Sequence, residues 1–169
     1  ENGSVISGNV GELFVLASTN VTAQNVTIPA SGSTEFQFDD GLVVRDSVFA
    51  GPALFTDSPN ALLASDTFQG GLTLTRSDFA AVDGSTIAGG LRLATTRLTT
   101  LTNLTLQGLG LAISPAFSGY DYNLRYYDHT LTNVTLSGGR VVILHNATSA
   151  NVAGFGQVIL VNVTYANLV

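Results

Sequence analysis

The chain of 169 residues contains no cysteine, methionine, tryptophan or lysine, and only 11% of its residues are charged. Without cysteine it forms neither disulfides nor thiolate metal sites. The net charge is −6 and the six cations, all arginine, are scattered, which argues against nucleic acid or an anionic lipid surface as a partner. No apolar run approaches the ~18 residues that span a bilayer, so we expect no membrane insertion. The abundant apolar residues are therefore expected to form the core of one domain, residues 1–169.

What the chain does have is a repeat at a spacing of 19 positions, in which one apolar residue, here named the anchor, is followed two positions later by glycine. The successive anchors are Phe49, Phe68, Ile87, Leu106, Leu136 and, in a degenerate copy, Phe155. The spacings between them are 19, 19, 19, 30 and 19, and a looser copy has its anchor at Ile28.

Positions at a fixed distance from the anchor share a chemical character. The position five residues before it is apolar in every copy, and the position one residue before it is mostly β-branched, as expected of an outward position on a strand. The position three residues before the anchor holds residue types that accept turn or left-handed backbone. The residues of this turn column are Asn25, Asp46, Ser65, Gly84, Asn103 and Asn133.

Short alternating strands, glycine punctuation and a period of roughly 20 residues are typical of a solenoid of stacked strands. We therefore predict an all-β fold, a single-domain parallel β-helix of about eight coils that is right-handed by general chirality. A β-sandwich is the alternative, but it would not keep columns in register at every nineteenth position. The same register places Asp57 beside Arg76 and Asp78 beside Arg97 on neighbouring coils, where we expect structural rather than catalytic ion pairs.

The 30-residue interval between Leu106 and Leu136 is one coil plus 11 extra residues, which we place in an inserted loop at about 114–130. The loop is rich in tyrosine, a residue favoured at contact surfaces, and loops on a rigid scaffold often carry binding residues. Contact with another protein or subunit is the preferred interpretation. The alternatives are sugar binding by tyrosine stacking, with Asp121, Asp128 and Arg125 as polar partners, and a loop folded onto its own solenoid. The candidate contact residues of the loop are Tyr120, Tyr122, Arg125, Tyr126, Tyr127 and His129.

The sequence contains no phosphate-binding loop, and Asp128 beside His129 is not accompanied by a serine nucleophile motif. Polysaccharide lyases and hydrolases of the parallel β-helix class resemble this chain in fold alone. Those enzymes use clustered carboxylates on one face, whereas Asp39, Asp40 and Asp46 have no acidic partners in register on the next coils. Asp39 and Asp40 could bind calcium, but two adjacent carboxylates supply too few oxygen ligands, and we prefer to interpret them as part of a solvated turn. We therefore expect no enzymatic activity, no cofactor and no metal.

Seven Asn-X-Ser/Thr sequons occur among only 12 asparagines, where chance would give about three. The chain also starts at Glu1 rather than methionine, as expected of a mature product whose signal segment has been removed. Both features favour a secreted glycoprotein, outside the cell or on its surface, although a structural need for asparagine and threonine explains part of the excess. The candidate glycosylation sites are Asn2, Asn20, Asn25, Asn103, Asn133, Asn146 and Asn162.

A β-helix leaves unpaired backbone groups at both ends, which natural solenoids cover with caps or charges. Here the first ten residues, ENGSVISGNV, predict no amphipathic helix, and the segment from Val158 to Val169 has no charged side chain. An apolar edge of this kind recruits another chain. The candidate contact residues of this edge are Val158, Leu160, Val163 and Tyr165.

A composition rich in Thr, Val and Asn and dense in sequons resembles extracellular filament and surface-layer subunits of prokaryotes, notably archaea. The resemblance and the open edge lead us to expect a structural subunit that polymerises with copies of itself. Assembly end to end or by strand addition would give an extracellular filament or surface lattice, with glycans or neighbouring filaments as further partners. The alternative function is a carbohydrate-binding, or less readily a polysaccharide-cleaving, β-helix module that uses the tyrosine-rich loop.

Overall fold

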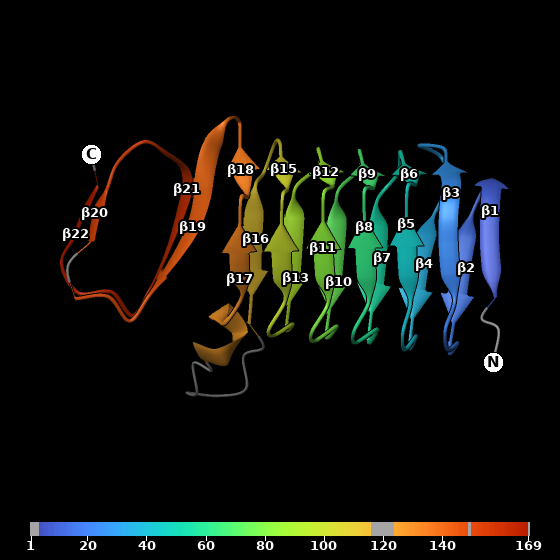
Figure 1. Cartoon of the computed structure of the whole chain (residues 1–169), viewed down its shortest axis with the longest axis horizontal. Coiled ribbons are helices and arrows are strands. Elements are labelled where there is room, and N and C mark those ends of the chain that lie inside the picture. Colours follow the sequence, from blue (N-terminus) through green and yellow to red (C-terminus); the bar gives the residue numbers. More distant parts are fainter. Residues whose placement is uncertain (1–3, 116–123, 149, 169) are drawn as a thin grey trace.

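The computed structural model describes residues 4–115, 124–148 and 150–168. The chain is a single-domain, all-β parallel solenoid of about 8 turns. Figure 1 shows the turns stacked side by side along the long axis of the molecule. Each regular turn gives one strand to each of three faces.

The first two faces form one sheet, because β3 is long enough to pair with strands of both. The first face contains β1 (Val5–Asn9), β3 (Thr22–Ile28), β5 (Val43–Arg45), β8 (Leu62–Ala64), β11 (Ala81–Asp83), β14 (Thr100–Thr102) and β17 (Thr130–Thr132). The second contains β6 (Val48–Phe49), β9 (Thr67–Phe68), β12 (Thr86–Ile87), β15 (Thr105–Leu106) and β18 (Thr135–Leu136). The third face is a separate sheet of β2 (Leu13–Leu16), β4 (Thr34–Gln37), β7 (Ala53–Thr56), β10 (Leu72–Thr75), β13 (Leu91–Ala94) and β16 (Leu111–Ser114).

The predicted columns are the observed register. Phe49 pairs with Phe68, Ile87 with Leu106, and Leu106 with Leu136 across the 30-residue interval. These pairings are parallel, which rules out the β-sandwich. The anchors from Ile28 to Leu106 are at most 1% exposed.

Aromatic rings stack along the interior of the solenoid. The ring centroids of Phe36 and Phe55 lie 4.5 Å apart, and those of Phe49 and Phe68 lie 5.1 Å apart with nearly parallel planes. Identical residues in one column bring flat faces together at about the strand spacing of ~4.8 Å. The core is therefore a set of side-chain ladders that each coil extends by one rung.

The turn column adopts the predicted left-handed backbone, with φ between 52° and 59° from Asn25 to Asn133. A second corner joins the third face to the first face of the next coil and is here named the ladder corner: residues 38–42, 57–61, 76–80 and 95–99. Buried side-chain oxygens in this corner accept backbone N–H groups of the preceding coil. The Oγ of Ser77 accepts from Ser58 (3.2 Å), and the Oγ1 of Thr96 accepts from Ser77 (3.2 Å).

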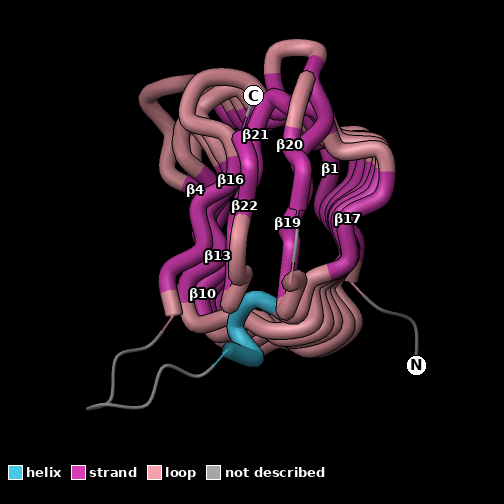
Figure 2. The backbone as a smooth tube through the Cα atoms, turned by 90° about the vertical axis from the view of Figure 1, so that its left-hand side faces the viewer, coloured by secondary structure: helices cyan, strands magenta, loops and turns pink. Residues whose placement is uncertain are grey.

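The last four strands leave the stack. After β18, the chain reverses through Ser137 and Gly138, and β19 (Gly139–His145) runs antiparallel to β18 before pairing with β21 (Phe155–Val161). The remaining pair is β20 (Ala150–Val152) with β22 (Ala166–Leu168). We name residues 139–168 the terminal hoop, which leans away from the stack in Figure 1 and is seen end-on in Figure 2.

The hoop corrects the prediction that the regular repeat continues to Phe155. Phe155 pairs with Arg140 rather than with Leu136, and its ring lies under the Arg140 guanidinium at 6.0 Å. The physical reason is a second repeat, because VILHNATSAN (142–151) and VILVNVTYAN (158–167) match at a spacing of 16 positions. The structure pairs these segments in that register, Val142 with Val158 and Ala150 with Ala166.

Candidate assembly surfaces

The described part of the inserted loop rests on its own solenoid. The 3-10 helix η1 (Leu124–Tyr127) lies at the end of the ladder corner (Figure 2). Tyr126 and Tyr127 are half-buried, whereas Arg125 is exposed. Tyr126 lines a shallow depression together with Arg76 and Arg97. The candidate residues Tyr120 and Tyr122 lie outside the described residues.

His129 closes the insert onto the preceding coil. Its Nδ1 accepts a hydrogen bond from the Thr99 backbone N–H (3.2 Å), and its Nε2 donates to the Tyr126 carbonyl (2.8 Å). Both bonds require the neutral ring with its proton on Nε2. Burial lowers the pKa of His129, which favours this neutral form. Both ring nitrogens are thus engaged within the chain.

The structure brings together one acid–histidine pair that the sequence separates by 17 positions. The Oδ1 of Asp128 lies 3.5 Å from the Nδ1 of His145, which joins the insert to the start of the hoop. The Nδ2 of Asn146 lies 3.4 Å from the same nitrogen. We interpret the pair as a contact between the insert and the hoop, because no nucleophile motif accompanies Asp128 in the sequence.

The four C-terminal candidate contact residues, Val158, Leu160, Val163 and Tyr165, all lie on the hoop and not beside η1. Tyr165 is 84% exposed and Leu160 is 39% exposed, whereas Val158 and Val163 are half-buried. Tyr165 also has a left-handed backbone, with φ of 62°. The structure therefore divides the predicted contact residues into two surfaces, the described insert and the hoop.

Strands at both ends of the stack have a single partner among the described residues. At the N-terminal end, β1 pairs with β3 and β2 with β4. At the other end, β16 pairs with β13 and β17 with β14, while β21 and β22 pair with β19 and β20. Each of these strands presents a row of backbone donors and acceptors outward. Figure 1 shows β1 and β2 at one extreme of the molecule and the hoop, which lies beyond β16 and β17, at the other.

Gln157 covers one point of the β16 edge, and sequence reasoning missed it. Its Oε1 accepts from the Leu111 N–H (2.8 Å), and its Nε2 donates to the Leu111 carbonyl (2.6 Å). In a neighbouring parallel strand, the two residues that flank the one opposite Leu111 would make these two bonds. Because alternate residues of a strand face the same side, the next outward backbone groups of this edge belong to Ile113.

The corner geometry gives the sequons a structural reason. All six sequon asparagines from Asn20 to Asn162 have left-handed φ angles between 51° and 55°, a conformation that asparagine tolerates well. In Asn25-Val26-Thr27 the valine is buried, and the threonine is the exposed residue directly before the anchor Ile28. Two asparagine pairs also bond to each other: Asn133 Nδ2 donates to Asn103 Oδ1 (2.9 Å), and Asn162 Nδ2 donates to Asn146 Oδ1 (2.6 Å).

The carboxylates weighed for calcium point in different directions. Asp39 is 1% exposed, and its Oδ1 accepts from the Ser18 N–H (2.8 Å). Asp40 is exposed, and its Oδ1 accepts from the Asn60 Nδ2 (3.3 Å). Within the described ranges no group of three or more His, Cys, Asp or Glu side chains is placed to hold a metal ion.

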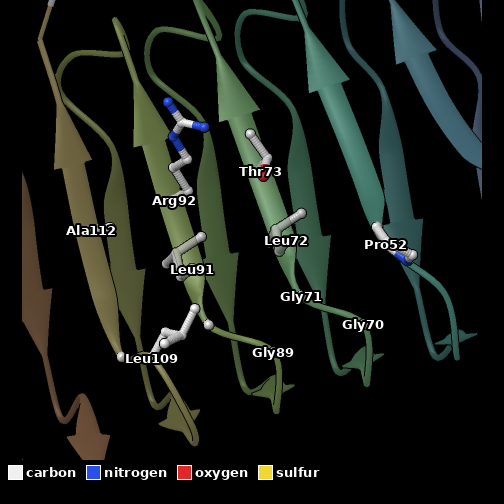
Figure 3. Close-up of a pocket in the computed structure, with 12 residues that line it drawn as sticks. Pro52, Gly70, Gly71, Leu72, Thr73, Gly89, Leu91, Arg92, Leu109 and Ala112 are labelled. Atoms are coloured by element: carbon white, nitrogen blue, oxygen red, sulfur yellow. The ribbon is translucent and has the colours of Figure 1, made fainter.

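The corner between the second and third faces, here named the glycine-rich corner, comprises residues 50–52, 69–71, 88–90 and 107–110. A shallow depression of about 230 Å³ lies where this corner meets the third face. Figure 3 shows Leu109 at one end of it and Arg92 directed along the sheet beside Thr73. The lining is mostly apolar, and Arg92 is the charged side chain in it. This surface offers shape for a partner side chain but no acid–base or nucleophilic pair.

Comparisons with family models, with curated proteins and with solved structures gave no match. Among the described residues, no helix is long and apolar enough to cross a membrane. The class defined by fold and surfaces is therefore the β-solenoids, and function is argued from the surfaces alone.

Proposed function

We propose that this protein is a structural subunit that self-assembles end to end, by strand addition, into an extracellular filament or surface lattice. The observation that carries the proposal is that strands at both ends of the described stack have one partner each. Pairing the last coil of one chain with the first coil of the next satisfies these backbone groups and continues the sheets. A contact between different ends of identical chains is heterologous and does not close, so it propagates.

The first coil also exposes apolar side chains that such stacking would bury. Val5 is 63% exposed, Phe14 is 52% exposed and Leu16 is 56% exposed. At the other end, Ile113 and Leu131 are only half-buried, whereas the interior residues one coil earlier, Leu93 and Leu101, have no exposed surface. Stacking can therefore bury apolar surface at both ends, on the outer face of the first coil and in the interior of the last one.

The extracellular setting and the absence of enzymatic activity belong to the same proposal. They are supported by a cysteine-free chain dense in sequons and by a surface without a nucleophile motif. The asparagine pairs restrict glycosylation, because Asn103 and Asn133 lie on adjacent coils and their side chains bond to each other. We expect at most one of these two to carry a glycan, which intact mass of the native protein measures.

A proline on the first edge strand tests the proposal. The N–H groups of Leu13 and Ala17 bond to the neighbouring β4 segment, so the N–H of Phe14 faces the open side. Phe14→Pro removes this donor at an edge where proline is tolerated. We expect the Phe14→Pro chain of 17.5 kDa to fold but to form no filaments, whereas Phe14→Ala, which keeps the N–H, still assembles end to end. Negative-stain electron microscopy and light scattering provide the measurement, and a wild-type chain that stays monomeric at high concentration contradicts the proposal.

A further inference from the structure

Three large apolar side chains stand exposed on the outer side of the ladder corner. Phe38 is 57% exposed, Phe79 is 56% exposed and Leu98 is 49% exposed. Phe79 and Leu98 occupy the same position on successive coils, and the N–H of Phe79 bonds to the Arg97 carbonyl of the next coil. Phe38 occupies the position that Asp57 and Arg76 hold further along the corner.

Their backbone conformation makes these residues costly for the isolated chain. Phe38, Phe79 and Leu98 have φ of 58°, 61° and 55°, in a region that bulky side chains disfavour. Other coils fill the position of Phe79 and Leu98 with Asn20, Gly41 and Asn60, which suit left-handed backbone. The position of Phe38 is more varied and holds Ala17, Asp57, Arg76 and Thr95 in the other coils. An unfavourable backbone that exposes rather than buries an apolar side chain gives the folded monomer nothing in return, so a contact outside the monomer is the physical reason for it.

Four of the charged residues of the ladder corner form two ion pairs, whereas the exposed Asp40 bonds to the Asn60 amide. Arg76 bonds to Asp57 at 2.6 Å, and Arg97 bonds to Asp78 at 2.5 Å. Copies of a chain with net charge −6 repel one another over most of their surface. Around Phe79 and Leu98 the apolar groups of the ladder corner lie among paired charges, so two copies approach there with little repulsion.

We propose that the ladder corner is a lateral contact between two copies of this chain, which pack through Phe38, Phe79 and Leu98. The corner runs along the side of the solenoid, so it stays accessible when chains stack through their ends (Figure 1). A two-fold arrangement places the same stripe on both partners, as closed dimers require. The inference extends the proposed self-assembly from the ends of the stack to its side, and in that sense it rests on the proposed function.

The test replaces all three residues by asparagine, Phe38→Asn with Phe79→Asn and Leu98→Asn, in the Phe14→Pro chain, where end-to-end growth is blocked. Sedimentation velocity of the Phe14→Pro chain should show a concentration-dependent dimer. The triple variant should weaken dimerisation at least ~10-fold, while its melting temperature rises by roughly 5 °C because asparagine relieves the backbone. Leu109→Asn, at a residue 85% exposed on another corner, is the matched control and should leave the dimer unchanged.

Three outcomes overturn the inference. One is a Phe14→Pro chain that shows no dimer at high concentration, and another is a triple variant that dimerises like its parent. The third is glycan-array binding that depends on the three residues without any self-association, which would assign the stripe to sugar. Failure of the proposed function looks different, because the wild-type chain would then form no filaments while side-by-side dimers persist.

Discussion

Single polar residues inside the corners decide how this solenoid responds to pH. The column of Ser47, Asp66 and Ser85 runs through the buried side of the turn column, and each side-chain oxygen accepts a backbone N–H of the preceding coil. Asp66 is 1% exposed and its Oδ2 has no hydrogen-bond partner. Burial raises the pKa of Asp66 to about 7, with a smaller contribution from the charge of Asp46. Asp39, in the ladder corner, has a pKa raised by burial as well.

Replacing Asp66 by serine should stabilise the protein at neutral pH and not at acidic pH. The folded chain keeps a proton on Asp66 up to a pKa of about 7, whereas the unfolded chain loses it near the ordinary value of 3.8. The free energy of unfolding therefore falls as pH rises through this window, by at most about 4 kcal/mol, and levels off above it. Asp66→Ser keeps the acceptor used by Ser47 and should flatten this fall, leaving the smaller slope due to Asp39.

Urea unfolding at pH 4, 6 and 8 measures the effect of Asp66→Ser. The exposed residue Glu12 provides the control, and Glu12→Ser should keep the wild-type slope. An Asp66→Ser chain whose stability still falls as steeply between pH 4 and pH 8 would show that Asp66 is not the titrating group.

At the scale of the elements, the glycine-rich corner fixes how closely the coils approach. A Cβ atom built on Gly70 would lie 2.5 Å from the Pro52 nitrogen and against the Gly51 carbonyl carbon. These are backbone atoms of the preceding coil and have no rotamer to change. Gly11, by contrast, has nothing within 4 Å of such an atom.

Gly70→Ala should therefore destabilise the protein where Gly11→Ala does not. Forcing a methyl group against backbone separates two coils and costs about 1–3 kcal/mol or more, whereas the exposed Gly11 position should change stability by less than ~0.5 kcal/mol. The midpoints of urea unfolding compare the two variants directly. Equal midpoints would mean that the corner is looser than its geometry indicates.

The same elements show what the sequence predicts and what it hides. A position that repeats in every coil can be predicted from the sequence because each coil imposes the same burial or backbone conformation there. The anchors Phe49, Phe68 and Ile87 are buried, and Asn103 and Asn133 have left-handed backbone. The ion pairs of Arg76 and Arg97 follow from the same register. The hoop was hidden because two copies of a shorter repeat, spaced by 16 positions, were interpreted with the longer period of the stack. The contacts of Gln157 and His129 could not be predicted from the sequence either, because each occurs only once and belongs to no repeated position.

At the scale of the whole molecule, the solenoid is a one-dimensional stack whose stability is distributed unevenly. Each coil contacts only its neighbours, so interior coils gain two interfaces and end coils gain one. The anchors of the interior coils, Phe49 to Leu106, have no exposed surface. The hoop buries fully only Val141, Val152 and Val161 among its described apolar side chains. The hoop is thus the least stable part of the described chain, and it lies at the end of the stack where the proposed assembly takes place.

Native-state hydrogen exchange should reveal this gradient and its loss on assembly. In the Phe14→Pro chain, which forms no filaments, backbone amides of β19 to β22 should exchange fastest among the strands and those of β8 to β15 slowest, because opening the hoop breaks few buried contacts. In assembled wild-type protein, the outward amide of Ile113 and the amides of the first coil should become protected, since a neighbouring chain now accepts their hydrogen bonds. The amide of Leu91, already bonded to Gly110, should not change and serves as the internal control. A hoop that exchanges as slowly as the central coils would identify it as a stable cap over β16 and β17, and would contradict the proposal that a second chain pairs with these strands.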